Sequence, residues 1–215
     1  MLSAVPRAEF VWVFCTSIAH IKVGKGSPSA LTTDFPVPAN WPVKIPLAGN
    51  DGNLIISNSW GSDEGDPTSP DSLLVHKLAE EGHIMVFAAG NEGSSPNSIG
   101  SPAITYYKDP KTGARRVLAI AATDRAKKVA SFSSRGPGSE KTKKIPDYPH
   151  RPDSSAPGYN TEGAWPADIG GADRTDPVKG PLRAISGTSM ATPATAGALA
   201  FLAMMFGVTT VGENL

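Results

Sequence analysis

The chain of 215 residues has little cysteine, little histidine and no excess of charge of either sign. Its single cysteine, Cys15, excludes an internal disulfide, and its four scattered histidines lack the spacing of a zinc site. The 20 basic and 20 acidic residues balance, so nothing favours binding to nucleic acid or to an anionic membrane. With 40% hydrophobic residues, the chain predicts one sizeable core that is stabilised by packing, with any metal held through oxygen atoms.

An apolar run, "EFVWVFCTSIA", lies near the start at residues 9–19. It is too short for a helix that spans a membrane, and no small-residue cleavage site follows it. The run therefore predicts a buried strand and no convincing signal peptide. Residues 24–50 are rich in proline and glycine, which favours a long surface connection.

Regular structure is expected after residue 52. "NLIISNSWG", "HIMVFAAGNEG" and "RVLAIAATD" are apolar runs that end in small polar residues, and they predict three strands. "SPDSLLVHKLAEEG", between the first two, has a helical pattern that starts at Ser or Asp and ends at Gly82. Because the runs are too continuous for half-exposed strands, we expect a doubly wound α/β fold whose mostly parallel sheet has helices on both faces.

Two further segments, residues 136–158 and 159–181, combine proline, glycine and charge without a regular pattern. Their composition is typical of solvated surface loops. Chemistry is expected elsewhere, at the carboxyl ends of the predicted parallel strands.

The stretch "ISGTSMATPATAGALAFLAMMF", residues 185–206, places Ser189 where a long apolar helix begins. Pro193 fits only near the start of a helix, which places this start close to Ser189. Unpaired N–H groups and the positive end of the helix dipole would stabilise an anion that forms beside the hydroxyl. A serine at this position is also compatible with a simple N-cap.

Asn91 follows the predicted strand in "VFAAGNEG", between two small or polar neighbours. It is compatible with an ordinary turn asparagine, but its amide could also point into a cleft. Together with the backbone N–H of Ser189, the Asn91 amide would supply the two donors of an oxyanion hole.

These residues resemble the subtilases, the subtilisin-like serine peptidases. "GTSMATP" resembles the block around their nucleophile, "AAGNEG" the block around their oxyanion asparagine, and "SNSWG" their substrate-pairing strand. "SPA", "ASFSSRGP" and "RPDSSAPG" are similar to further blocks in family order, so the resemblance covers residues 52–206.

The resemblance implies a serine endopeptidase whose nucleophile is Ser189 and whose oxyanion donor is Asn91. It also implies an extended polypeptide substrate that adds as a strand beside residues 57–61. The residues that it assigns to substrate binding are Ser57, Asn58, Ser59, Trp60, Gly61, Ala88, Ala89, Gly90 and Thr188.

One part of the family pattern is missing. A serine nucleophile needs a base that is itself oriented by a carboxylate, and subtilases supply these from an Asp block and then a His block earlier in the chain. Neither block is present. Only His20 precedes Ser57, and Asp34 and Asp51 follow it, in the wrong order. The remaining histidines, His76, His83 and His150, are not expected to act as the base.

The chain is therefore interpreted as a single partial peptidase domain over residues 1–215, the C-terminal part of a subtilase catalytic domain. Residues 1–50 match poorly, and 52–206 form the core. An upstream segment or a second chain would supply Asp and His, and this chain alone is expected to be weakly active.

Two alternatives to this function stay open. A non-catalytic relative would keep the peptide groove without hydrolysis. A sedolisin-like peptidase would share the Gly-Thr-Ser block but carry an Asp where this chain has Asn91.

The acidic loop at residues 62–66 could hold calcium through oxygen, as many family members do. The family also favours a secreted protein, although the sequence itself does not identify a compartment.

Overall fold

The computed structural model describes residues 55–145, 148–164 and 182–206. The chain divides into two compact units, Met1–Pro36 and Val37–Leu215, and all of the described residues belong to the second. The strand expected at residues 9–19 and the connection expected at 24–50 lie outside the described residues, as does His20.

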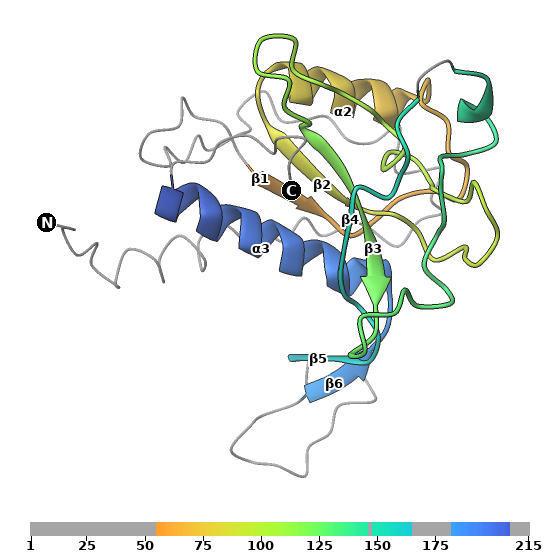
Figure 1. The fold of residues 1–215 in the computed structure, drawn as a ribbon, viewed down its shortest axis with the longest axis vertical. Coiled ribbons are helices and arrows are strands. Elements are labelled where there is room, and N and C mark those ends of the chain that lie inside the picture. The colour runs from red at the N-terminus through yellow and green to blue at the C-terminus, as the bar shows by residue number, and fades with distance from the viewer. Residues whose placement is uncertain (1–54, 146–147, 165–181, 207–215) are drawn as a thin grey trace, which may run out of the picture. The chain divides into compact units, whose positions relative to one another are not determined.

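Four parallel strands form the central sheet (Figure 1). Each strand pairs with the next one along the chain, in the spatial order β1-β2-β3-β4. Their bounds are β1 Ile55–Asn58, β2 Ile84–Ala88, β3 Val117–Thr123 and β4 Ser154–Pro157. The first three strands are those that the apolar runs predict, and their parallel pairing confirms the expected α/β class.

Helices α2 (Pro70–Glu80) and α3 (Thr188–Phe206) lie on opposite faces of this sheet (Figure 1). Both were expected from the sequence. Pro70 at the first helical position, with Asp71 behind it, starts α2 because proline has the right φ and an acidic side chain suits the positive end of the dipole. Neither of the described α-helices is long and apolar enough to cross a membrane.

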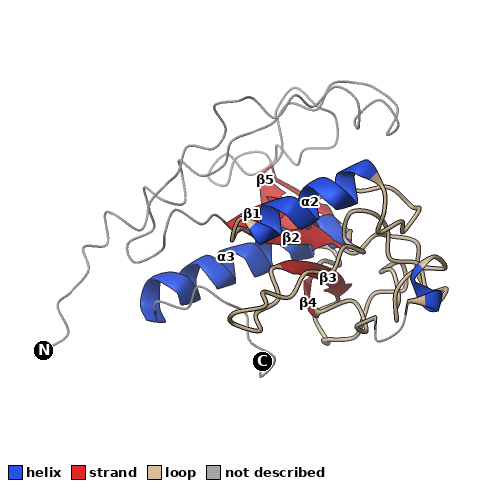
Figure 2. Ribbon diagram, turned by 90° about the horizontal axis from the view of Figure 1, so that it is seen from above, coloured by secondary structure: helices blue, strands red, loops and turns tan. Residues whose placement is uncertain are grey.

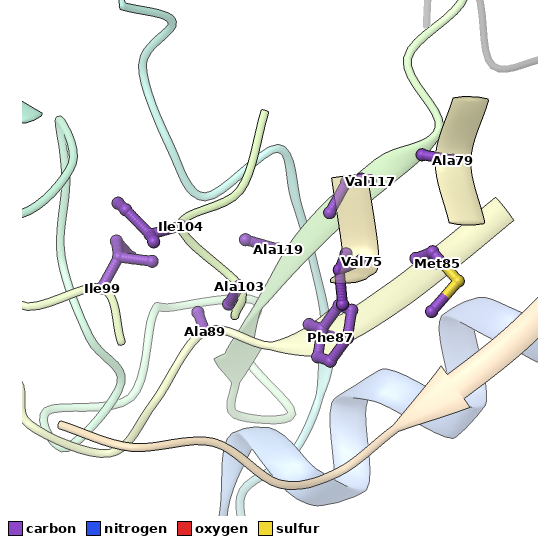
Figure 3. Close-up of a cluster of buried hydrophobic side chains, with 10 residues drawn as sticks. All are labelled: Val75, Ala79, Met85, Phe87, Ala89, Ile99, Ala103, Ile104, Val117 and Ala119. Atoms are coloured by element: carbon purple, nitrogen blue, oxygen red, sulfur yellow. The ribbon is translucent and has the colours of Figure 1, made fainter. Parts of the chain in front are cut away.

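Two apolar clusters fill the faces of the sheet. Side chains of β2 alternate between them: Met85 and Phe87 face α2, whereas Ile84 and Val86 face α3. The cluster on the α2 side, shown in Figure 3, is Val75, Ala79, Met85, Phe87, Ala89, Ile99, Ala103, Ile104, Val117 and Ala119. Because both faces are covered, β2 and β3 are buried along their whole length, which explains their continuous apolar sequence.

Two of the expected surface loops contain strands. The segment 136–158 holds the short 3₁₀ helix η2 (Thr142–Lys144) and β4, and the next segment begins with β5 (Thr161–Ala164). β5 pairs antiparallel with β6 (Leu182–Ile185), which leads directly into α3. The loop prediction was therefore wrong for these strands, and residues 165–181 lie outside the described part.

A buried arginine explains how a polar segment becomes the edge strand β4. The Arg151 side chain is fully buried; it donates to the carbonyls of Ala103, Thr105 and Val117 at 2.6, 2.5 and 3.1 Å, and it pairs with Asp153 at 3.0 Å. Asp153 in turn accepts the N–H of Ala119 in β3 at 2.7 Å. Polar contacts thus hold β4 in place, which is why no apolar run in the sequence predicts this strand.

Candidate active site

The site lies where the carboxyl ends of β1 and β2 meet the start of α3. Figure 2 shows the strands in red, with many of the loops, in tan, to one side of them. Ser59 follows β1, Asn91 follows β2, and Ser189 is the second residue of α3. The Ser59 hydroxyl donates to the Ser189 carbonyl at 2.8 Å, and the Thr188 N–H donates to Asn91 Oδ1 at 2.9 Å. The structure therefore brings the two sequence-predicted catalytic residues together.

Pro193 explains why the Ser189 carbonyl is free to accept a side chain. In an α-helix, each N–H bonds the carbonyl four residues earlier, and Pro193 has no N–H for that of Ser189. The Ser59 hydroxyl takes this place at 2.8 Å. The start of α3 is thereby tied to the end of β1, and the spacing of serine and proline in the sequence already contains this signal.

The Ser189 side chain is half-buried, and its hydroxyl donates to the Ser59 carbonyl at 3.3 Å. Around it, Gly187 N–H donates to Gly158 at 2.8 Å, and Met190 N–H donates to Gly187 at 3.1 Å. The backbone N–H of Ser189 has no hydrogen-bond partner among the described residues. It is one of the first N–H groups of the helix, so it is free to bind an anion.

The Asn91 side chain is oriented by Thr188. Its Oδ1 atom accepts the Thr188 N–H at 2.9 Å and the Thr188 hydroxyl at 3.1 Å. This leaves the Nδ2 amide as a donor without a partner in the described part of the chain, 3.7 Å from where a Cβ on Gly187 would lie. The Ser189 N–H lies 3.7 Å from the same position, so two donors without a described partner flank Gly187 at the start of α3. An oxyanion hole requires two such donors.

Thr188 itself has a different position from the one expected. It is fully buried, and its hydroxyl accepts the Gly90 N–H at 3.3 Å while donating to Asn91. A buried threonine in these contacts orients the asparagine, and this orienting contact is not evident from the sequence alone.

The residues predicted to bind substrate along β1 fall into two groups. Ser57 and Ser59 are exposed, and Trp60 is 48% exposed with its ring edge-on to Phe87 at 5.6 Å. Asn58 is buried, and its amide donates to the Ile56 and Val86 carbonyls at 3.1 and 3.4 Å. The first group faces outward, whereas Asn58 links β1 to β2.

The remaining residues predicted to bind substrate are glycines and alanines with little free space around them. Gly61 has room for no side chain, because a Cβ there would lie 2.7 Å from the Ser101 carbonyl oxygen. Ala88 and Ala89 are buried, and Ala89 belongs to the cluster on the α2 side. Gly90 is half-buried with φ +111°, a conformation that glycine adopts most readily.

A cavity of about 270 Å³ lies next to the serine, between α3 and the β5-β6 hairpin. Its lining residues are Thr161, Glu162, Gly163, Arg183, Ile185, Ser189, Met190 and Pro193. Both charged and apolar side chains line this cavity.

The three histidines of the described residues are placed away from the serine. His76 on α2 pairs with Glu80 at 3.6 Å and lies edge-on to Tyr107. His83 is buried and precedes β2, so it lies at the other end of this strand from Asn91. His150 is exposed and precedes β4. No histidine of the described part forms a hydrogen bond with the Ser189 hydroxyl.

The acidic loop at residues 62–66 does not fit a calcium site. Asp66 Oδ2 pairs with Lys141 at 2.6 Å and its Oδ1 accepts the Thr68 N–H and hydroxyl at 2.8 and 2.7 Å. The hydrogen bonds from Lys141 and then Thr68 lower the pKa of Asp66 to about 2. Among the described residues, no group of three His, Cys, Asp or Glu side chains could hold a metal ion.

Comparison with known proteins agrees with this geometry. A model of the subtilase family matches residues 16–208. Pyrolysin of Pyrococcus furiosus is 35% identical over 177 residues, which cover 72% of this chain and 11% of pyrolysin. An alkaline protease of Alkalihalobacillus alcalophilus is 30% identical over 202 residues, or 94% of this chain and 40% of that protein.

Among solved structures, Sphericase superposes with a TM-score of 0.51 at 29% identity, covering 74% of this chain and 45% of that one. The chain spans less than half the length of each of these relatives. Since the family model covers most of the chain and a subtilisin-like structure shares its fold, this chain belongs to the subtilase family of serine peptidases.

Proposed function

We propose that this chain carries the nucleophile and the oxyanion hole of a serine-type endopeptidase. Ser189 is the nucleophile, and Asn91 and the Ser189 N–H are the oxyanion donors. The observation that carries the proposal is the orientation of Asn91: Thr188 occupies its Oδ1 atom, which leaves the Nδ2 amide free beside the start of α3.

In the proposed reaction, Ser189 Oγ attacks the carbonyl carbon of the scissile peptide and transfers its proton to a base. The carbonyl oxygen gains a negative charge in the tetrahedral intermediate, and the two donors stabilise that charge because they are already in place. The C–N bond then breaks, the amine leaves with the proton, and water releases the acyl group from Ser189.

The base belongs to none of the described histidines in this proposal. The Ser189 hydroxyl donates to the Ser59 carbonyl, so it has no acceptor that could take its proton. We propose that an Asp/His pair from another segment or from another chain approaches the serine from the side opposite the oxyanion donors.

The proposed substrate is an extended polypeptide. β1 pairs only with β2 in the described sheet, so residues 57–61 offer backbone groups to which a peptide can add as a strand. Ser57, Ser59 and Trp60 are exposed and would contact this peptide, whereas Ala88–Gly90 would form the wall of a pocket for one of its side chains. Action outside the cell is part of this proposal, because the family favours secretion.

A fluorophosphonate probe tests the nucleophile directly, with intact mass as the readout. We expect Ser189 to be labelled, either in this chain alone or after addition of a family segment that bears the Asp and His blocks. Ser189→Ala should abolish the adduct, whereas Ser131→Ala, which removes an exposed serine, should keep it. A folded chain that stays unlabelled under both conditions would refute the proposal, and peptide binding without labelling would favour the non-catalytic alternative.

A further inference from the structure

The segment Ala130–Pro137, which joins β3 to β4, runs behind the loop that carries Asn91. It contains two consecutive serines, Ser133 and Ser134, and both are fully buried. A buried hydroxyl is costly unless it is hydrogen-bonded, so the partners of each serine indicate what it does.

Ser134 bonds the residues on both sides of Asn91. Its N–H donates to the Gly90 carbonyl at 3.0 Å, and its hydroxyl accepts the Glu92 N–H at 3.1 Å. Gly93 extends the contact, since its N–H donates to Phe132 at 2.8 Å.

The contact with Gly90 is also close. A Cβ on Gly90 would lie 2.6 Å from Ser134 Oγ, so no side chain can come between the two residues. The backbone of the Asn91 loop thus rests directly on the serine.

Asn91 itself is exposed, so packing of its own side chain does not fix its backbone. Thr188 holds only the far end, at Oδ1. The direction of the Nδ2 amide therefore depends on where the backbone of residues 90–92 lies, and Ser134 has a hydrogen bond to each end of that segment.

We infer that Ser134 is a positioning residue of the oxyanion hole, which sets the backbone of Asn91 so that its amide and the Ser189 N–H converge. This inference rests on the proposed function for its catalytic consequence, but the positioning itself can be measured without catalysis. Oxyanion donors act through preorganisation, so a small displacement of Asn91 weakens the stabilisation of the intermediate.

Ser133 provides a matched control. It is as buried as Ser134 and also accepts one backbone N–H, that of Ala122 in β3 at 3.1 Å. Ser133→Ala and Ser134→Ala therefore remove the same atoms and one accepted hydrogen bond each, but only the second removes a hydrogen bond to the Asn91 loop.

The first measurement is amide hydrogen exchange by NMR on the full chain. The reporter is the Thr188 N–H, which bonds Asn91 Oδ1 and does not contact Ser134. Ser134→Ala should speed its exchange by about tenfold, whereas Ser133→Ala should leave it within twofold and instead speed exchange at Ala122. Unchanged exchange at Thr188 in Ser134→Ala, with faster exchange at Glu92 to show that the bond was lost, would overturn the inference.

The second measurement is the fluorophosphonate labelling rate in a cycle of four proteins: unchanged chain, Ser134→Ala, Asn91→Ala and the double variant. If Ser134 acts only through Asn91, Ser134→Ala should slow labelling by about tenfold in the unchanged chain. It should not slow labelling further in the Asn91→Ala chain. An equal loss in both backgrounds would overturn the inference. If the unchanged chain is labelled neither alone nor with the added Asp/His segment, the proposed function fails and the exchange result alone decides the positioning role.

Discussion

At the scale of single residues, the candidate site depends on the neighbours of Ser189. Thr188 donates to the Asn91 Oδ1 atom, which leaves the Nδ2 amide without a partner among the described residues. Pro193 has no N–H for the Ser189 carbonyl, so the Ser59 hydroxyl donates to that carbonyl. Residue type in the sequence predicted Ser189 and Asn91. The orienting role of Thr188 could not be predicted, because it depends on two segments that are 97 residues apart.

Replacement of Asn91 tests the oxyanion hole. Asn91→Ala should slow fluorophosphonate labelling of Ser189 by about a hundredfold to a thousandfold, the size of the effect of removing this kind of donor in subtilisin, a member of the same family. Thermal unfolding should also shift to lower temperature, because the buried Thr188 N–H and hydroxyl lose their acceptor, so the labelling rate is measured well below the Tm of the variant. A labelling rate within threefold of the unchanged chain would exclude Asn91 from the hole.

Gly90 is expected to tolerate no side chain. Gly90→Ala would place a Cβ 2.6 Å from Ser134 Oγ at a residue with φ +111°, so both a clash and backbone strain result. We expect a loss of about 1–3 kcal/mol in the free energy of unfolding, measured by urea denaturation. Gly163→Ala is the control, because a Cβ there meets no atom within 4 Å. Equal stability of the two variants would contradict the structure at Gly90.

Asp109 predicts how stability changes with pH. Hydrogen bonds from Arg116 and then from the Lys111 N–H hold the pKa of its carboxyl at about 2. The folded pKa is below the usual value near 4, so this stabilisation is complete above about pH 4 and is lost as the pH falls towards 2. Asp109→Asn should therefore lower Tm at about pH 6 and match the unchanged chain near pH 2. A Tm difference that is the same at both pH values would refute this linkage.

At the scale of elements, apolar pattern predicted those strands and helices that are buried on both faces or along one side. β1, β2, β3, α2 and α3 are all of this kind. β4, β5 and β6 were missed, because each has only four residues and the first two are polar and contain proline or glycine. Their positions are set by partners in the sheet and by side chains such as Arg151, and local sequence carries no sign of either.

Arg151 should therefore be more important to stability than any residue within β4. Arg151→Met would leave Asp153 with Arg115 as its ion-pair partner at 3.0 Å, but it would remove the second partner of Asp153 and the donors to three carbonyls. We expect the free energy of unfolding to fall by about 2–4 kcal/mol, because buried carbonyls that lose a charged donor are left without a hydrogen-bond partner. Arg125→Met, at an exposed position, serves as the control. A loss below about 1 kcal/mol would show that these contacts do not hold β4 in place.

At the scale of the whole molecule, the proposed function assigns one half of a catalytic apparatus to the described part. It contains Ser189, the two donors that we propose for the oxyanion hole, and the strand β1, which pairs on one side only within the described sheet. The sequence could predict where these groups lie, because the carboxyl ends of parallel strands lie at the same end of the sheet. The source of the base was not predictable, since no Asp or His block precedes β1 in the sequence.

The pH dependence of labelling distinguishes a serine with a base from one without. A nearby histidine would make the fluorophosphonate rate level off above its pKa, about 6.5 in the ordinary case. Without a base, the reactive species is the serine alkoxide, whose population rises about tenfold per pH unit, so we expect no levelling between about pH 6 and 9 for this chain alone. Replacing all four histidines by glutamine should leave this profile unchanged. A plateau that disappears in one His→Gln variant would identify that histidine as the base and would place the complete apparatus in this chain.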